Sequence, residues 1–350
     1  MSASYNSFNH VCFKELNEFE SSNVRIFNNY HGVLEPSRLA KLNNNDIVIY
    51  SQLGESLNDT RLEQVLAKFS NQFVIVITTQ KHFNFPLSSN KYQIITIPSA
   101  YAAYTTIMDR DTVQIDNRNF EKLFLSFNKR AQWTRQALAQ FAVNTKLNDR
   151  MFLSYHCHDV HKIGTRQTYL NQNEIIGTTW FNQDLDLEYF YSLIPITINI
   201  PDEFHSRSVG NKDFYEKSFC SIVTETYIGE NHDPFFTEKI FKPIAFAHPF
   251  IVSSSAGALS LLKNLGFKTY SDIFNEEYDE IENHQLRFEA ILKEMLRLAA
   301  LSDNEIQSMY KKVIPTIKYN YNFFYNELPK IYNNDIQRIK QQIQSIIDKI

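Results

Sequence analysis

Residues 45–79 read NDIVIYSQLGESLNDTRLEQVLAKFSNQFVIVITT, and this stretch decides the fold class. The apolar run that begins at Ile47 predicts a buried strand, residues 56–70 predict an amphipathic helix, and QFVIVITT from Gln72 predicts a second strand. A further strand is predicted for YQIITIPS, residues 92–99. Strands that alternate with helices favour a parallel sheet, so the sequence predicts an α/β protein.

The same alternation returns in the second half of the chain. The polar run DRDTVQIDNRN, residues 109–119, interrupts the pattern, and we place the domain boundary at its end. We expect an N-terminal domain over residues 1–118 and a C-terminal domain over 119–330, both Rossmann-like and doubly wound. Residues 331–350 are expected to form a C-terminal helix whose isoleucine stripe packs back on the protein. In the C-terminal domain, strands are predicted at 123–127, 151–156, 219–225 and 248–254, and helices begin near 133 and 237.

Bulk composition narrows the class of protein. A length of 350 residues suits two domains, and a net charge of -4 provides no overall basic field for nucleic acid or anionic lipid. The three cysteines are scattered without paired spacing, which is typical of a reducing compartment. No apolar run approaches the ~18 residues of a membrane span, and the first residues lack the pattern of a signal peptide. We therefore expect a cytoplasmic protein, in the host cytoplasm if the chain is viral.

The stretch FCSIVTETYIGENHDPFFTEKIFKPIAFAHPFIV, residues 219–252, carries the most informative pattern. A predicted strand ends at the acidic Glu225, a loop follows, and the run FFTEK opens a helix before the next strand. Thr237 is predicted to cap this helix, whose N-terminal N–H groups and dipole suit an anion. Lys239 adds a full positive charge in the first turn, and the neighbouring Glu238 can accept hydrogen bonds from hydroxyl groups.

This arrangement resembles the donor-binding segment of α1,3-fucosyltransferase-like glycosyltransferases of the GT-B class, over about residues 122–281. The resemblance implies two domains facing a cleft and a sugar moved from a nucleotide-sugar donor to an acceptor hydroxyl, with inversion and without a metal or bound cofactor. It assigns donor binding to Glu225, Thr237, Glu238 and Lys239. Lys239 and the helix end would hold the diphosphate, which leaves as an anion. Phe235 stands where the family usually has tyrosine, so the sugar and the nucleotide stay open.

A second match lies upstream, in LFLSFNKRAQWTRQALAQF, residues 123–141. Asn128 and Arg135 fall on the matching positions, and the resemblance implies that Arg135 reaches the diphosphate. The planar guanidinium fork suits phosphate oxygens. Arg130 is a further candidate in the same loop, with Lys129 weaker. A solvated surface charge is the alternative interpretation of each cation.

The catalytic base and the last donor contact are less well marked. Transfer needs a base to deprotonate the acceptor hydroxyl, and Glu55 follows a predicted strand at the edge where α/β sheets bind ligands. Glu35 is a lesser candidate, and a solvated glutamate is the alternative for both. His156 ends the predicted strand 151–156 and is expected to face the cleft, where it would touch donor or acceptor.

Two short motifs suggest metal binding, and we favour neither. In HCHDVH, residues 156–161, Asp159 sits one position too early for the zinc pattern HxHxDH. The run DLD, residues 184–186, matches a metal signature of three letters only, and acidic residues in a first helical turn explain it. We expect no metal, because Lys239 and Arg135 would neutralise the leaving group.

Three alternatives for function remain open at this stage. The acceptor is expected to be a glycan, but a phage-type enzyme would glycosylate a modified DNA base instead. A non-catalytic nucleotide-sugar-binding protein would keep Glu238 and Lys239 without a base. A zinc hydrolase would use the histidines of residues 156–161. The C-terminal helix also leaves open a homo-oligomer contact.

Overall fold

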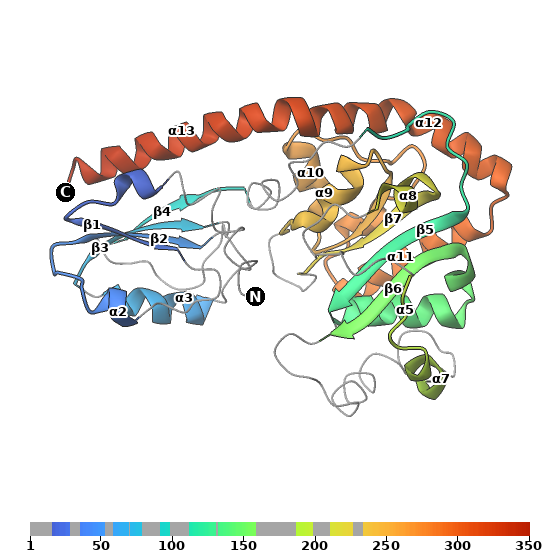
Figure 1. Cartoon of the computed structure of the whole chain (residues 1–350), viewed down its shortest axis with the longest axis horizontal. Helices are drawn as coiled ribbons and strands as arrows, with labels where there is room; N and C mark the ends of the chain where they lie inside the picture. Colours follow the sequence, from blue (N-terminus) through green and yellow to red (C-terminus); the bar gives the residue numbers. More distant parts are fainter. Residues whose placement is uncertain are drawn as a thin grey trace. The chain divides into compact units, whose positions relative to one another are not determined.

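The computed structural model describes two compact units, each built around one parallel sheet (Figure 1). Unit 1 comprises Met1–Met108 and Glu327–Ile350, and unit 2 comprises Asp109–Asn326. The predicted α/β class with two parallel sheets is confirmed. The residues that the structure describes are 16–28, 36–52, 59–69, 71–78, 92–98, 112–130, 132–158, 187–198, 211–226 and 234–350.

Sheet A, the sheet of unit 1, has the strand order β1-β2-β3-β4, with all pairs parallel. Its strands are β1 (Val24–Asn28), β2 (Ile47–Gln52), β3 (Phe73–Thr78) and β4 (Tyr92–Thr96). The short helices α2 (Pro36–Leu39) and α3 (Asp59–Leu66) lie in the connections, and 3-10 turns span Asn17–Phe19 and Ala67–Phe69. Strands β2, β3 and β4 confirm the sequence prediction. Strand β1 was not predicted, because its five residues include a charged arginine and form no long apolar run.

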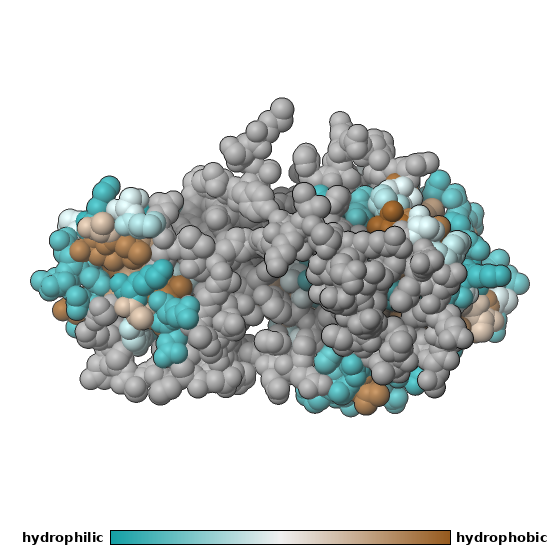
Figure 2. Space-filling model, turned by 90° about the horizontal axis from the view of Figure 1, so that it is seen from below, coloured by the Kyte–Doolittle hydropathy of each residue, from teal (hydrophilic) through white to brown (hydrophobic). Residues whose placement is uncertain are grey.

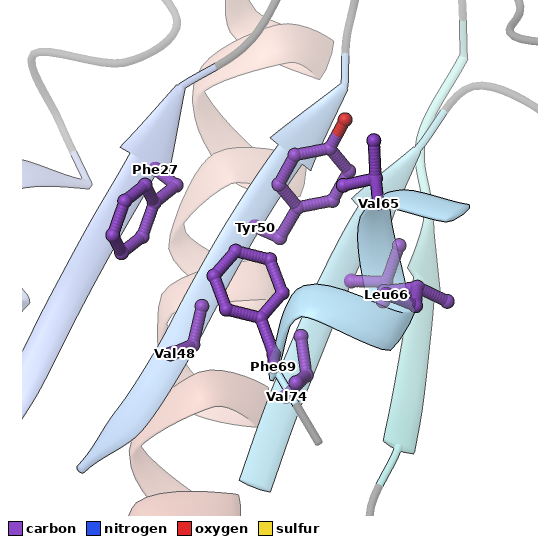
Figure 3. Packing of buried hydrophobic residues seen from close by; sticks show 8 residues of the cluster. Phe27, Val48, Tyr50, Val65, Leu66, Phe69 and Val74 are labelled. Carbon is purple, nitrogen blue, oxygen red and sulfur yellow. The ribbon is translucent and has the colours of Figure 1, made fainter. Parts of the chain in front are cut away.

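The strand order of sheet A determines how its two faces are covered. Each connection moves to the next strand in the same direction, and right-handed crossovers then place every connecting helix on one face. That face packs Val48, Tyr50, Val74 and Val76 against Phe69 after α3, with 6.2 Å between the ring centroids of Tyr50 and Phe69 (Figure 3). Alternate residues point to the opposite face, which needs a different cover.

Helix α13 (Leu328–Ile347), from the end of the chain, covers the opposite face of sheet A (Figure 1). Neighbouring positions of β2 and β3 that alternate to this face are isoleucines at most 4% exposed. The buried side of α13 is a single stripe at spacings of three and four residues. That stripe consists of Leu328, Tyr332, Ile336, Ile339 and Ile343. The stripe predicted from the sequence stops before Ile350, which is 61% exposed.

We expect Ile343→Ala to lower the free energy of unfolding by about 3 kcal/mol, because Ile343 is fully buried and the substitution leaves a cavity under α13. Ile350→Ala makes the same substitution at an exposed position and should change the free energy of unfolding by less than about 0.5 kcal/mol. Urea unfolding of the full chain, followed by circular dichroism, measures both. Equal effects of the two substitutions would contradict the packing of α13 described here.

Sheet B, the sheet of unit 2, has the order β6-β5-β7-β8, again with all pairs parallel. Its strands are β5 (Lys122–Arg130), β6 (Met151–His158), β7 (Ser218–Thr224) and β8 (Phe250–Ser253), as predicted within a few residues. The chain leaves β5 toward β6 through α5 (Trp133–Asn144) and leaves β7 toward β8 through α9 (Glu238–Ala245). Because these connections run in opposite directions, α5 and α9 lie on opposite faces of the sheet (Figure 1). The carboxyl ends of β5 and β7 therefore form a switch point, where α/β sheets bind ligands.

The remaining helices of unit 2 surround this sheet. Asn283 caps the long helix α11 (His284–Ala299) with its side chain, and Ser302 and Glu305 form a capping box at the start of α12 (Asp303–Asn322). The other described helices of unit 2 are α7 (Leu187–Ser192), α8 (Lys212–Glu216), α10 (Ala258–Asn264), the 3-10 turns Leu147–Arg150 and Glu277–Glu280, and the π-helix that begins at Phe323 and ends at Glu327.

The described surface carries no extended apolar region on the face seen in Figure 2, where hydrophobic residues form small separate patches among hydrophilic ones. Within the described residues, no helix combines the length and the apolar character needed to cross a membrane.

His248 links β7 to the residues just before β8 and is completely buried. Its Nε2 lies 2.9 Å from the carbonyl oxygen of Ser218, and its Nδ1 lies 2.8 Å from Oγ of Ser221. A carbonyl only accepts, so Nε2 carries the hydrogen and Nδ1 accepts from the serine hydroxyl. Burial, and then the charge of Arg118, lower the pKa of His248 to about 3.

The neutral state of His248 predicts acid sensitivity. Unfolded histidine takes up a proton below about pH 6.5, whereas folded His248 does not until about pH 3, so stability is lost as the pH falls between these values. The loss should be about 1.4 kcal/mol per pH unit between pH 6 and pH 4. Urea unfolding across this range gives the free energy of unfolding as a function of pH. Its slope should be smaller in His248→Gln than in the wild type, by the equivalent of about one bound proton. Equal slopes would show that His248 titrates normally in the fold.

Candidate functional site

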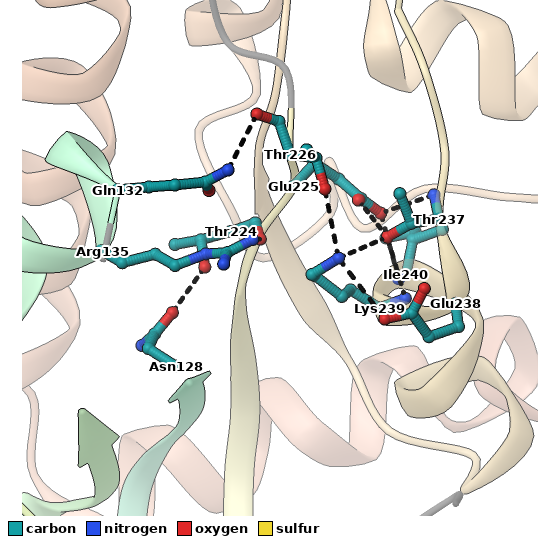
Figure 4. A network of polar contacts seen from close by, with 10 residues as sticks. All are labelled: Asn128, Gln132, Arg135, Thr224, Glu225, Thr226, Thr237, Glu238, Lys239 and Ile240. Carbon is teal, nitrogen blue, oxygen red and sulfur yellow. Dashed lines mark hydrogen bonds and ion pairs between the residues drawn. The ribbon is translucent and has the colours of Figure 1, made fainter. Parts of the chain in front are cut away.

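Four segments converge at the switch point of sheet B and form one polar network (Figure 4). They are the ends of β5 and β7 and the starts of α5 and α9, four places that the fold brings to the same edge of the sheet. The side chains in this network are those of Asn128, Gln132, Arg135, Thr224, Glu225, Thr226, Thr237, Glu238 and Lys239. We call this set the switch-point network.

Glu225 follows β7 and caps the start of α9. It is completely buried, and its Oε1 accepts hydrogen bonds from the backbone N–H groups of Thr237 (3.2 Å) and Ile240 (3.3 Å). The hydroxyl of Thr237 donates to the other carboxylate oxygen. Burial raises the pKa of Glu225, against the opposing effects of Lys239 and of the bonds from Thr237. A carboxylate placed here complements the positive end of the helix dipole.

This geometry corrects the predicted role of the helix end. We expected the first N–H groups of α9 to face the diphosphate of a donor, but two of these donors are already bonded to Glu225. Through these bonds Glu225 holds the start of α9 in place, and its contact with a donor stays a prediction.

Thr237 is the N-cap of α9, and this part of the prediction is confirmed. Its Oγ1 donates to Glu225 and accepts from the backbone N–H of Lys239 at 3.4 Å and from Nζ of Lys239 at 2.9 Å. The Thr237 hydroxyl thus connects the buried carboxylate of Glu225, to which it donates, with the ammonium of Lys239, from which it accepts. The direction of the first turn of α9 is determined by these bonds.

Lys239 and Glu238 are the accessible members of the network on α9, with side chains 26% and 19% exposed. Nζ of Lys239 lies 3.3 Å from Oγ1 of Thr226 and 3.4 Å from Oε1 of Glu238. Burial by itself would raise the pKa of Glu238, but the charges of Lys239 and then Lys242 outweigh it, and the pKa is lowered. Glu238 is therefore an ionised acceptor for hydroxyl groups beside a cation.

Lys242 is a further cation of this site that the sequence analysis missed. It is half-buried, and burial lowers the pKa of its ammonium group to about 8, while the charge of Glu238 opposes this shift. The spacing contained the signal, because residues four and three positions after Glu238 and Lys239 lie on the same side of a helix. The motif TEK by itself does not include Lys242.

Asn128 ties the end of β5 to the end of β7. Its side chain is 1% exposed, Nδ2 donates to Oγ of Ser126 at 3.0 Å, and Oδ1 accepts from Oγ1 of Thr224 at 2.6 Å. Both polar atoms of the amide are thus bonded inside unit 2. Asn128 therefore holds together the two strand ends on which the network is built, and its contact with a donor stays a prediction.

Arg135 and Gln132 bring the start of α5 to β7. Nη2 of Arg135 lies 3.3 Å from the carbonyl oxygen of Thr224, and Nε2 of Gln132 lies 3.4 Å from that of Thr226. Gln132 is the N-cap of α5 but provides no side-chain cap, unlike Glu225 and Thr237 at α9. Within the described residues, the buried Oε1 of Gln132 and the buried hydroxyl of Thr134 have no hydrogen-bond partner. The start of α5 therefore keeps polar groups that the described part of the chain does not satisfy.

Arg118 holds the other end of α9. Its guanidinium is buried at 3% exposure and donates to the carbonyl oxygens of Phe246 and Ala247, each at 3.0 Å. These carbonyls follow the last turn of the helix, where a cation is favourable. Helix α9 thus has a buried carboxylate at its start and a buried guanidinium at its end.

Several predicted residues lie outside this description. Glu55, Glu35, the DLD motif at 184–186 and residues 159–161 fall among residues that the structure does not describe, as does the side chain of Arg130. His156 is half-buried on β6, which β5 separates from β7, and it takes no part in the contacts given above. In the described part of the chain, no cluster of His, Cys, Asp and Glu side chains is arranged to hold a metal ion.

Comparison with known proteins gives only distant similarities. No protein-family profile matches the sequence, and no curated protein matches it. One solved structure, a trehalose-6-phosphate synthase (OtsA), aligns at 12% identity over 94% of this chain and 75% of its own, with a TM-score of 0.43. A UDP-forming α,α-trehalose-phosphate synthase from Burkholderia xenovorans in complex with glucose-6-phosphate aligns at 9% identity over 94% and 77%, with a TM-score of 0.41. Both TM-scores lie below 0.5.

We expect Glu225→Ala to lower the free energy of unfolding by about 3 kcal/mol, because it leaves two buried N–H groups and a hydroxyl without an acceptor at the start of α9. Glu225→Gln keeps one oxygen acceptor and should cost about 1 kcal/mol. Urea unfolding of the full chain measures both. The exposed Glu121 serves as the control, since Glu121→Ala should change stability by less than about 0.5 kcal/mol. A cost for Glu225→Ala as small as that of the control would rule out the capping role.

Proposed function

We propose that the protein is a GT-B glycosyltransferase and that the switch-point network binds the diphosphate of a nucleotide-sugar donor. The observation that supports this most strongly is the convergence of two cations from opposite faces of sheet B. Arg135 from α5 lies against Thr224, and Lys239 from α9 lies against Thr226, two residues further along the same strand end. A nucleoside diphosphate carries two or more negative charges as it leaves, and positive groups on both sides stabilise it.

The positive groups at the starts of α9 and α5 fit the binding of a diphosphate between them. Glu225 already accepts from the N–H groups of Thr237 and Ile240, so in this proposal the side chains on that side of the site neutralise the donor. At α5, the start of the helix has no side-chain cap, and a guanidinium stands beside it. A phosphate placed there would accept hydrogen bonds from the helix end and from the planar fork of Arg135.

Glu238 provides a hydrogen-bond acceptor beside the cations that are proposed to bind the diphosphate. It is ionised, partly exposed and adjacent to Lys239, so it would accept hydrogen bonds from the hydroxyls of the ribose or of the transferred sugar. The same pairing of Glu238 with Lys239 is what the fucosyltransferase-like resemblance of residues 219–252 implies. Oε1 of Glu238 lies 3.4 Å from Nζ of Lys239, so a hydrogen-bond acceptor and a cation stand side by side.

Acceptor binding is assigned to unit 1 in this proposal, with a glycan hydroxyl as the nucleophile and Glu55 as the base. Glu55 follows β2 by three residues, on the carboxyl side of a parallel strand where ligands of α/β sheets bind. Direct attack of the deprotonated hydroxyl on the anomeric carbon would invert its configuration and release the nucleoside diphosphate. Arg135 and Lys239 provide the charge that this departure requires.

Lys239→Ala and Arg135→Ala should each weaken nucleoside diphosphate binding by roughly tenfold to a hundredfold and reduce transfer by at least about a hundredfold, because each removes a charge from the departing group. A thermal-shift panel of GDP, UDP, CMP and dTDP with their sugar-linked forms first identifies the ligand, since ligands that bind the folded state raise its melting temperature. Titration calorimetry then gives the affinities of the wild type and the variants.

The exposed Lys311 on α12 offers a matched control outside the network, and Lys311→Ala should bind as the wild type does. If the panel yields no ligand for the wild type, or if both variants bind and turn over like Lys311→Ala, the proposed donor site is wrong.

A further inference from the structure

Thr226 lies between the two helix starts of the switch-point network (Figure 4). It follows the end of β7 by two residues, and its carbonyl oxygen accepts from Nε2 of Gln132, the N-cap of α5, at 3.4 Å. Its hydroxyl oxygen lies 3.3 Å from Nζ of Lys239, in the first turn of α9. One residue after β7 is thus bonded to the helices on both faces of sheet B.

The bond with Lys239 determines what the Thr226 hydroxyl can still do. An ammonium group only donates, so the hydroxyl oxygen is the acceptor and its own hydrogen must point elsewhere. Among the described residues, no group accepts that hydrogen. Thr226 is half-buried, in contrast to the completely buried Glu225 beside it. The hydroxyl of Thr226 therefore keeps a hydrogen that it can donate to a ligand.

The surroundings of this hydroxyl favour an anionic oxygen as the acceptor. Lys239 lies against it, and Nη2 of Arg135 lies 3.3 Å from the carbonyl oxygen of Thr224, two residues earlier on the same strand end. The carboxylate of Glu225 already accepts from two backbone N–H groups and a hydroxyl at the start of α9. A hydroxyl that accepts from a cation is also polarised, which strengthens the bond that it donates. A phosphate oxygen between the two cations would be a matching acceptor.

We propose that the hydroxyl of Thr226 donates a hydrogen bond to the diphosphate of the nucleotide-sugar while it accepts one from Lys239. This inference rests on the proposed function and adds to it a neutral group that contacts the phosphates. The charge of the leaving diphosphate is balanced by Lys239 and Arg135. Thr226 fixes the place of one phosphate oxygen and holds the ammonium of Lys239 beside it.

Thr226→Val keeps the shape of the side chain and removes its hydroxyl. Because the lost hydrogen bond goes to a charged group, nucleoside diphosphate binding should weaken by about tenfold. Thr226→Ser keeps the hydroxyl and should recover most of that loss. The half-buried Thr316 on α12 offers a matched control, and Thr316→Val should bind as the wild type does. Titration calorimetry of the full chain with GDP or UDP, whichever binds, measures these affinities.

A second pair of variants separates a direct contact from a purely structural role of Thr226. In a Lys239→Met background there is no ammonium left for Thr226 to hold. If the hydroxyl contacts the phosphates, adding Thr226→Val to this background should weaken binding further, by about threefold or more. If the added substitution changes nothing there, Thr226 acts only through Lys239 and the proposed contact is wrong.

The outcomes also separate this inference from the proposed function. If Lys239→Ala weakens nucleotide binding but Thr226→Val binds like Thr316→Val, the donor site stands and Thr226 is not part of it. If the wild type binds neither nucleotide, the proposed function fails and the inference fails with it. Thermal unfolding of each variant establishes that the substitutions leave the fold intact.

Discussion

The carboxylate of Glu225 is the interaction on which the candidate site depends. Removing a carboxylate from water costs several kcal/mol unless hydrogen bonds and opposite charge compensate. At the end of β7, the compensation comes from two backbone N–H groups, the hydroxyl of Thr237, the positive end of α9 and the neighbouring Lys239. Because all these partners belong to the start of α9, the helix can begin at one place only. This constraint also determines the positions of Glu238 and Lys239, which stand in the first turn of α9.

Arg118 completes the constraint at the opposite end of the helix. Its guanidinium bonds to the carbonyls of Phe246 and Ala247, which would otherwise be buried acceptors without donors. Each end of α9 is thus bonded to a residue from a distant part of unit 2. A helix of eight residues is too short to be stable alone, so these two buried charges and the apolar face of α9 determine where it lies.

A helix end that is already occupied changes how an anion can be held. Backbone dipoles have a fixed direction and a fixed charge, and at α9 the N–H groups of Thr237 and Ile240 are bonded to Glu225. In the proposed function, lysine and arginine side chains therefore provide the charge that holds the diphosphate. Among the described residues, no comparable anion bonds to the start of α5, and the hydroxyl of Thr134 has no hydrogen-bond partner. The two helix starts at the switch point are therefore different in kind.

The sequence predicts the parts of this arrangement that are local. Continuous apolar runs predicted β2, β3 and β7, and a threonine before Glu-Lys predicted the cap of α9 because the cap bond spans two residues. The role of Glu225 was out of reach, since it depends on which way the loop after β7 returns. The burial of Asn128 follows from the pairing of β5 with β7, and sequence periodicity does not show which polar side chains a neighbouring strand will cover.

Strand order also explains why the faces of the two sheets are covered by different parts of the chain. Sheet A advances in one direction, so its own connections cover a single face, and the other face requires the isoleucine stripe of α13 from the end of the chain. Sheet B reverses direction at β5, so α5 and α9 cover both faces from within Asp109–Asn326. The reversal that lets unit 2 cover itself is the same feature that opens the switch point. Unit 1 has no such reversal among its described strands, and its second face is covered only after α13, Leu328–Ile347, is made.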